Sequence, residues 1–109
     1  MKKGELWLVD IPQTNGYEQS GLRPVLLMSS VEANTVIIIP LTTNIAALRY
    51  PHTVEMHPSA SNELKVTSIA LAFQLRAIDK KRLQRKTGEC DVEIIEDIDT
   101  MIKHLLSLS

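Results

Sequence analysis

The feature that most constrains the fold is a change in hydrophobic periodicity near residue 91. Before that point, apolar residues form short runs or alternate with polar ones, which is typical of β-strands. After it, apolar residues recur at steps of three and four: Ile95, Ile98, Ile102 and Leu105. This pattern predicts one amphipathic helix over residues 91–108. Several short strands followed by one helix predict a mainly β fold, a partly open barrel closed by a C-terminal helix.

The strands are predicted from β-branched runs separated by Gly-, Asn- and Pro-rich segments. We expect strands over residues 5–11, 23–28, 35–41, 53–56 and 67–78, with loops over residues 12–22, 44–51 and 57–65. The unbroken apolar run at 35–41 is typical of a strand that is buried on both faces. Asp79 is expected to cap a short helical turn that extends to Leu83.

Length and composition limit the class of protein. A chain of 109 residues is expected to form one domain over residues 1–109. No apolar stretch approaches the roughly 20 residues that span a bilayer, and no signal peptide is recognisable, so we expect a cytoplasmic protein without a membrane segment. The one cysteine, Cys90, is interpreted as a free thiol, which fits a reducing compartment.

The charges are unevenly distributed along the chain, although the net charge is only −1. Residues 91–109 hold five acids and one base, whereas residues 1–90 hold eight acids and eleven bases. Five bases crowd into seven positions: Lys80, Lys81, Arg82, Arg85 and Lys86. Such a run is either an ordinary solvated segment or a set of contacts to phosphate groups, and the sequence leaves both interpretations open.

Several familiar site chemistries have no matching pattern in the sequence. There is no glycine-rich phosphate loop. His52, His57 and His104 lie apart, without cysteine or carboxylate partners at ligand spacing. We therefore expect no metal site and no cofactor.

One segment does suggest a site. An acid and an amide, Glu18 and Gln19, precede Arg23, which stands directly before Pro24. A residue before proline is pushed toward extended geometry, so Arg23 is expected to be held at the start of a strand. A guanidinium held in this way can bind a phosphate bidentately. The alternative is a salt bridge to Glu18 that only fixes the loop.

Four blocks, in chain order, resemble the MazF/PemK toxin family. They are Lys3-Gly4-Glu5-Leu6-Trp7-Leu8-Val9-Asp10; Gly16-x-Glu18-Gln19-x-Gly21-x-Arg23-Pro24-Val25; Ile39-Pro40-Leu41-Thr42-Thr43; and Ser68 to Leu83 with its segment Gln74-Leu75-Arg76-Ala77-Ile78-Asp79-Lys80-Lys81-Arg82-Leu83. The resemblance covers nearly the whole chain, and the second block is its most specific part.

The resemblance implies an SH3-like barrel, the PemK/CcdB-like toxin fold, that forms a homodimer. It further implies a sequence-selective endoribonuclease of a type II toxin–antitoxin system that cuts single-stranded RNA without a metal. In this chemistry the ribose 2′-OH attacks the adjacent phosphate and leaves a 2′,3′-cyclic phosphate and a 5′-OH. The expected partners are RNA and an acidic antitoxin with a disordered tail.

Residue roles follow from the same resemblance. Arg23 and Thr42 are expected at the scissile phosphate, and Glu18 either orients Arg23 or helps to take the 2′-OH proton. Gln19 and Gln74 are expected to lie at the bound RNA. Lys80, Lys81 and Tyr17 are further RNA-binding candidates, Tyr17 by stacking on a base.

The chain also departs from the family pattern. Leu71 and Phe73 stand where one branch of the family has an arginine and an aspartate on the late strand, so that branch's acid–base pair is missing. Phe73 also replaces a glutamate of other members and is expected to be a core residue, with base stacking as the alternative. The competing function is a non-catalytic toxin of the same fold that poisons DNA gyrase; the motif from Glu18 to Pro24 favours the nuclease.

Overall fold

A computed structural model describes residues 1–10 and 22–108 of the chain. Its strands are β1 (Glu5–Asp10), β2 (Leu22–Glu32), β3 (Thr35–Thr42), β4 (Thr53–Met56), β5 (Ser68–Leu71), β6 (Arg76–Asp79) and β7 (Leu83–Glu89). Short 3-10 turns are η1 (Ile45–Arg49), η2 (Ala72–Gln74) and η3 (Lys80–Arg82), and the α-helix is α1 (Val92–Leu105). No helix within these ranges is long and apolar enough to cross a bilayer.

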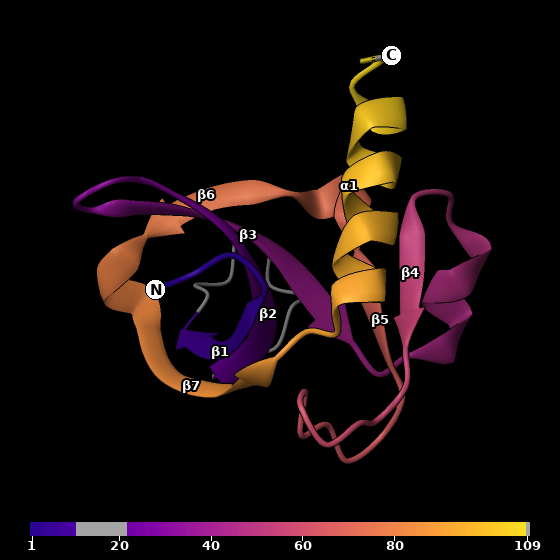
Figure 1. The fold of residues 1–109 in the computed structure, drawn as a ribbon, viewed down its shortest axis with the longest axis horizontal. Coiled ribbons are helices and arrows are strands. Elements are labelled where there is room, and N and C mark those ends of the chain that lie inside the picture. The colour runs from indigo at the N-terminus through magenta and orange to yellow at the C-terminus, as the bar shows by residue number, and fades with distance from the viewer. Residues whose placement is uncertain (11–21, 109) are drawn as a thin grey trace, which may run out of the picture.

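The strands form one antiparallel sheet that curls on itself (Figure 1). Its order is β4-β5-β3-β2-β1-β7, and β6 pairs with the same strand, β3, as β5 does. The two end strands, β4 and β7, do not pair with one another in the described part of the chain. The sheet is thus a partly open barrel, and α1 packs beside β4 and η2. The expected mainly β fold with a C-terminal helix is confirmed.

β3 runs through the middle of the sheet and has apolar side chains on both faces. Ile39 and Leu41 belong to a core that also contains Ile98 of α1. Val36 and Ile38 belong to a second core on the other face. The prediction that the run at residues 35–41 is a strand buried on both faces is confirmed, because only such a strand can place alternate residues in two separate cores.

The helix ends earlier than the sequence pattern suggests. α1 stops at Leu105, because Ser107 adopts a left-handed conformation with φ of 58°. The amide of Leu108 then donates to the Lys103 carbonyl at 2.7 Å, and the amide of Ser107 donates to the His104 carbonyl at 3.1 Å. This pair of bonds is a Schellman motif, which satisfies the last carbonyls of a helix.

One long strand was expected over residues 67–78, and this is wrong. Leu41 of β3 pairs with Ala70, whereas Ile38 pairs with Arg76. Three steps along β3 therefore correspond to six steps along its partner. The three extra residues form η2, which interrupts the strand between β5 and β6. Like a β-bulge, such an insertion turns side chains away from the sheet, and bulges are frequent next to functional sites.

Candidate functional site

A small pocket lies where β3 ends and η1 begins. Its volume is about 190 Å³. The residues that line it are Thr42, Asn44, Ala46, Ala47, Arg49, Tyr50, Leu71, Phe73 and Gln74. The structure therefore brings together Thr42 and Gln74, two residues that the sequence predicts for the site. Within residues 1–10 and 22–108, no carboxylate lines the pocket, and the one formal charge is the guanidinium of Arg49.

Arg23 lies near the start of β2, on the strand next to Thr42. The pairing of β2 with β3 begins at Val25 opposite Pro40, so Arg23 and Thr42 each stand two residues beyond the same pair, at the ends of neighbouring strands. On its other side Arg23 pairs with Val9 of β1, and its side chain is half-buried. Arg23 is thus anchored in the sheet.

The hydroxyl of Thr42 is held where the chain leaves the sheet. Its Oγ1 accepts a hydrogen bond from the Asn44 backbone amide at 3.2 Å. The Oδ1 atom of Asn44 then caps η1 by accepting from the Ala46 amide at 3.0 Å. At the other end of η1, Tyr50 donates from its amide to the Ala47 carbonyl at 3.1 Å. These bonds fix the spacing between Thr42 and the aromatic side of the pocket.

The sequence offered base stacking by Phe73 as the alternative to a core position, but it did not predict that Phe73 would meet Tyr50 in the pocket. The rings of Tyr50 and Phe73 lie 5.7 Å apart at an angle of 49°. The guanidinium carbon of Arg49 lies 4.9 Å from the centre of the Tyr50 ring. Phe73 is 37% exposed, so the expectation that it is a core residue is wrong. The reason is η2, which takes Phe73 out of the sheet.

The lysine candidates lie elsewhere. Lys80 and Lys81 belong to η3, which Asp79 caps as expected, its Oδ1 accepting from the Lys81 amide at 3.0 Å. Asp79 pairs with Thr35, at the opposite end of β3 from Thr42. Those ends are seven residue steps apart along the strand, which is about 23 Å. The structure therefore does not bring these lysines into the pocket. Tyr17, Glu18 and Gln19 lie outside the described residues.

Other reactive groups are inert or structural. Burial, with the nearby Asp91 carboxylate adding to its effect, raises the pKa of Cys90 to about 12, so this thiol stays protonated at neutral pH and is a poor nucleophile. In the described ranges, no three His, Cys, Asp or Glu side chains come together in a way that could hold a metal ion.

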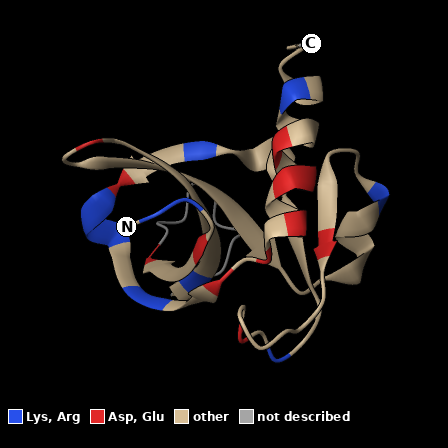
Figure 2. Cartoon of the chain, in the orientation of Figure 1, with Lys and Arg blue, Asp and Glu red and all other residues tan. Residues whose placement is uncertain are grey.

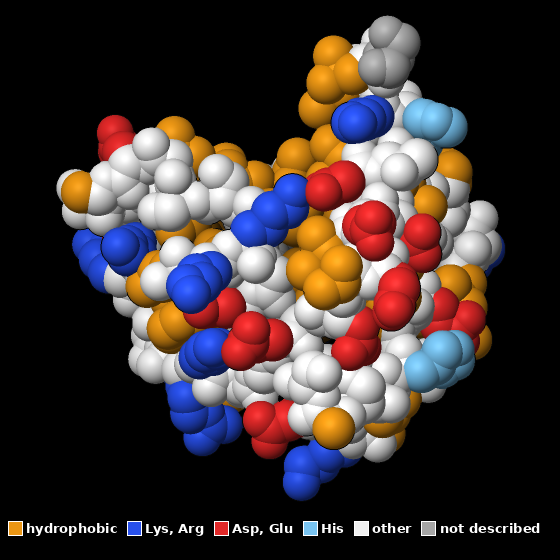
Figure 3. Space-filling model, in the orientation of Figure 1, with side chains coloured by type: hydrophobic (Ala, Val, Ile, Leu, Met, Phe, Trp, Pro, Cys, Tyr) orange, Lys and Arg blue, Asp and Glu red, His pale blue; other side chains and the backbone are white. Residues whose placement is uncertain are grey.

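The charges divide the surface into two regions. Lysines and arginines gather on η3 and β7, whereas carboxylates follow the face of α1 that is turned to the viewer (Figure 2; Figure 3). A polyanion such as RNA is attracted to the first region and repelled by the second.

Comparison with known proteins identifies the family. The family model described as PemK-like, MazF-like toxin of type II toxin-antitoxin system matches residues 2–106. The chain belongs to this family. The toxin is also 31% identical, over 117 aligned residues, to Endoribonuclease MazF9 of Mycobacterium tuberculosis, an alignment that covers 99% of this chain and 98% of that protein.

Solved structures agree with the toxin's fold. MazF from Deinococcus radiodurans is 26% identical, with a TM-score of 0.72 over 96% of this chain and 94% of that one. An endoribonuclease in complex with its cognate antitoxin from a mycobacterial species has a TM-score of 0.75 at 23% identity, over 98% of this chain and 95% of that one. This second match concerns the fold alone.

Proposed function

We propose that this toxin is a metal-independent, sequence-selective endoribonuclease in which Arg23 and Thr42 carry the chemical step. The endoribonuclease class follows from the family and from the relative MazF9. The alternative, a toxin that poisons DNA gyrase without cutting, has no support in the relatives described above. The substrate is single-stranded RNA in the cytoplasm.

The observation that carries the proposal is that Arg23 and Thr42 each stand two residues beyond the pair of Val25 with Pro40, at the ends of neighbouring strands. During the reaction the ribose 2′-oxygen bonds to phosphorus and the bond from phosphorus to the 5′-oxygen breaks. The products are a 2′,3′-cyclic phosphate and a 5′-OH, and the proton lost by the 2′-OH is balanced by one gained at the leaving oxygen. Negative charge grows on the phosphate in between. A fixed guanidinium and hydroxyl placed at that charge stabilise it.

The remaining roles belong to the segment before β2 and to the pocket. Glu18 orients Arg23 or takes the 2′-OH proton, and Gln19 and Tyr17 bind the neighbouring nucleotides. Gln74, which shares the pocket with Thr42, contacts the RNA beside the scissile phosphate. Lys80 and Lys81 bind phosphates farther along the strand.

The proposal includes two protein partners. Leu106 and Leu108, which are 54% and 57% exposed, continue the apolar end of α1, and a second copy of the chain covers this surface in a homodimer. Light scattering at micromolar concentration is expected to give twice the mass of the chain. An acidic antitoxin with a disordered tail occupies the basic RNA-binding surface by the same electrostatics, as expected for the toxin of a toxin–antitoxin pair.

Variants of Arg23 and Thr42 test the proposal. Loss of one fixed donor at a developing charge typically costs about 2.7–4 kcal/mol, so Arg23→Ala is expected to slow cleavage by roughly 100-fold or more. Arg23→Lys keeps the positive charge but loses the bidentate fork of donors, so its cleavage rate should lie between those of the wild type and Arg23→Ala. Thr42→Val keeps the shape, loses the hydroxyl and should also slow cleavage. The measurement is the single-turnover rate on RNA with product-end analysis.

Controls separate chemistry from folding and from bulk charge. Lys65→Ala removes one positive charge from the exposed loop between β4 and β5 and should keep the wild-type rate. EDTA should leave the wild-type enzyme active. Normal cleavage by Arg23→Ala, or loss of wild-type activity in EDTA, would overturn the mechanism.

A further inference from the structure

The pocket beside Thr42 contains an arrangement that the cleavage chemistry does not use. Two of the chain's four aromatic residues, Tyr50 and Phe73, meet there. Both remain substantially exposed, at 45% and 37%. Exposed aromatic side chains held in contact at the wall of a pocket offer a flat apolar surface that water solvates poorly, and such surfaces are frequent in binding sites.

The arrangement is rigid. The Nη2 atom of Arg49 donates to the hydroxyl of Tyr50 at 2.8 Å, and its guanidinium also lies against the ring. The Tyr50 carbonyl accepts from Thr53 Oγ1 at 3.0 Å, which ties the residue to the start of β4. A surface held in this way loses little conformational entropy when a ligand binds.

The geometry limits how a ligand can lie. Tyr50 and Phe73 are tilted and 5.7 Å apart, so a planar group cannot slide between them. Arg49 already contacts Tyr50. The exposed part of the Phe73 ring therefore remains for a planar ligand, with Tyr50 and Arg49 supporting it from behind.

We infer that Phe73, supported by Tyr50 and Arg49, is a stacking platform for one unpaired RNA base next to the scissile phosphate, and that Gln74 reads the edge of that base. The inference rests on the proposed function for the identity of the ligand. Unpaired RNA bases are recognised by stacking on aromatic and arginine side chains and by hydrogen bonds to their edges.

Gln74 suits the reading role. It follows Phe73 directly, lines the same pocket and is exposed. Its amide offers a donor and an acceptor together, and within the described residues its side chain makes no hydrogen bond. Thr42 lines the same pocket as Phe73 and Gln74. The base on Phe73 therefore belongs to a nucleotide that adjoins the phosphate held by Thr42.

The chemistry of the pocket favours RNA over a protein ligand. Among the described residues the lining carries no negative charge, and the cation of Arg49 favours a group that bears or adjoins a phosphate. An acidic antitoxin side chain would use the same cation but would gain nothing from the aromatic ring. Removing the ring alone should therefore weaken the binding of RNA but not the binding of an acidic antitoxin side chain.

The test removes the ring and follows both binding and cleavage. Phe73→Leu loses the ring and keeps an apolar side chain, Phe73→Tyr restores a ring, and Gln74→Ala removes only the edge contact. Val31→Ala, at an exposed apolar residue of β2 outside the pocket, is the matched control. Cleavage is measured on a random-sequence RNA pool. Binding is measured with fully 2′-O-methylated oligonucleotides that carry 2-aminopurine at each position in turn, since stacking quenches its fluorescence.

The wild type is expected to quench 2-aminopurine at one position and to show a base preference next to the cut. Phe73→Leu should raise KM by about 5- to 150-fold, with a smaller change in kcat, and should abolish that quenching. Phe73→Tyr should restore both. Gln74→Ala should keep the quenching but broaden the base preference, and Val31→Ala should match the wild type.

The outcomes separate this inference from the proposed function. If Phe73→Leu keeps the wild-type KM, base preference and quenching, the platform is overturned, whereas cleavage by the same protein still supports the nuclease. Quenching by a wild type that cuts nothing would support the platform and overturn the nuclease, and a wild type that does neither would overturn both. A Phe73→Leu toxin that handles RNA normally but no longer binds purified antitoxin would show that the pocket takes a protein side chain, which also overturns the platform.

Discussion

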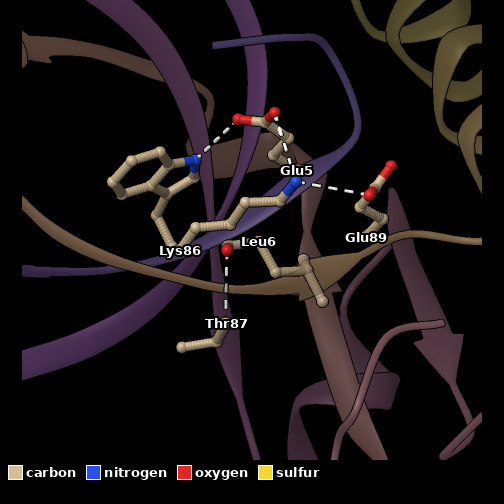
Figure 4. A network of polar contacts seen from close by, with 6 residues as sticks. Glu5, Leu6, Lys86, Thr87 and Glu89 are labelled. Atoms are coloured by element: carbon tan, nitrogen blue, oxygen red, sulfur yellow. Dashed lines mark hydrogen bonds and ion pairs between the residues drawn. The ribbon is translucent and has the colours of Figure 1, made fainter. Parts of the chain in front are cut away.

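Glu5 shows how a single charged residue can stabilise the edge of the sheet. Glu5 as a whole residue is only 8% exposed. Its carboxylate accepts a hydrogen bond from Trp7 Nε1 at 2.9 Å and lies 3.5 Å from Lys86 Nζ on β7 (Figure 4). Burial alone would raise the pKa of Glu5. The hydrogen bonds involving Trp7 and the Lys2 backbone, together with the charge of Lys86, lower it by more than burial raises it, so the pKa lies below its ordinary 4.5.

This direction of the pKa shift predicts a pH dependence. A carboxylate with a lowered folded-state pKa stabilises the fold above its unfolded pKa, and this contribution is lost as the pH falls through the folded value. Glu5→Gln is therefore expected to lower the free energy of unfolding by about 1–3 kcal/mol at neutral pH. The difference from the wild type should narrow as the pH falls below 4.5. Urea unfolding at a series of pH values measures both.

Glu89→Gln is the control for the Glu5 prediction. Glu89 contacts the same ammonium, with Lys86 Nζ at 3.3 Å from its Oε2, but its side chain is 66% exposed. Exposed ion pairs contribute little, so this variant should change stability much less. A difference between wild type and Glu5→Gln that is constant down to about pH 3 would show that the charge of Glu5 is not what stabilises the edge.

At the scale of elements, the long loop between β4 and β5 depends on Asn62. Its side chain is 1% exposed. Oδ1 accepts from the amides of Ser59 and Leu64, both at 2.9 Å, and Nδ2 donates to the His57 carbonyl at 2.8 Å. Gly88 of β7 packs so closely on the Asn62 carbonyl that a Cβ atom there would overlap it. One amide thus shapes the loop and sets it against β7.

Asn62→Ala is expected to lower the free energy of unfolding by about 2–4 kcal/mol, because three partly buried backbone groups lose their partner. The control is Asn34→Ala, at an exposed asparagine between β2 and β3, which should change stability by less than about 0.5 kcal/mol. Chemical denaturation measures both variants. Equal losses at the two positions would contradict this role for Asn62.

The element scale also shows what the sequence can predict. The central strand, the short strand at 53–56 and the helix follow from apolar periodicity, and all three are confirmed. β7 was not predicted because its residues are mostly polar, including Gln84, Arg85 and Lys86. η2 was missed because it depends on how β3 is shared between β5 and β6, which no local pattern encodes.

The same limit applies to the site. Arg23 stands out in the sequence because it directly precedes Pro24, whereas Thr42 was predicted from the family resemblance. The pairing of Tyr50 with Phe73 is a tertiary contact between distant segments. Asn44 was the available local signal, because an asparagine is a frequent cap for a following helical turn. This signal could have indicated η1, but not the contact between Tyr50 and Phe73.

At the scale of the whole molecule, basic and acidic side chains lie on separate parts of the surface. The basic region on η3 and β7 lies apart from the acidic face of α1 (Figure 2). Lys81 is exposed and lies 3.9 Å from Asp79 Oδ2, while Lys80 is half-buried beside it. An exposed pair of this kind is weak, so both lysines remain available to a phosphate. RNA that reaches from the pocket to η3 would follow β3 from one end to the other.

This geometry predicts a specific dependence of RNA binding on salt. Each phosphate neutralised on a single strand contributes about 0.7 to the slope of log K against log salt. Replacing both lysines, in Lys80→Ala/Lys81→Ala, should therefore weaken binding and reduce the slope by about 1.4. The base preference at the cut should stay the same, because phosphate contacts carry no sequence information.

Binding of a 2′-O-methylated RNA that extends several nucleotides beyond the cut, titrated over a range of salt concentrations, measures the slope. Lys65→Ala removes a charge from the segment between β4 and β5, which belongs neither to the pocket lining nor to η3, and should keep the wild-type slope. A double variant with the wild-type slope would show that η3 does not contact the RNA and that its basic run is only a solvated segment.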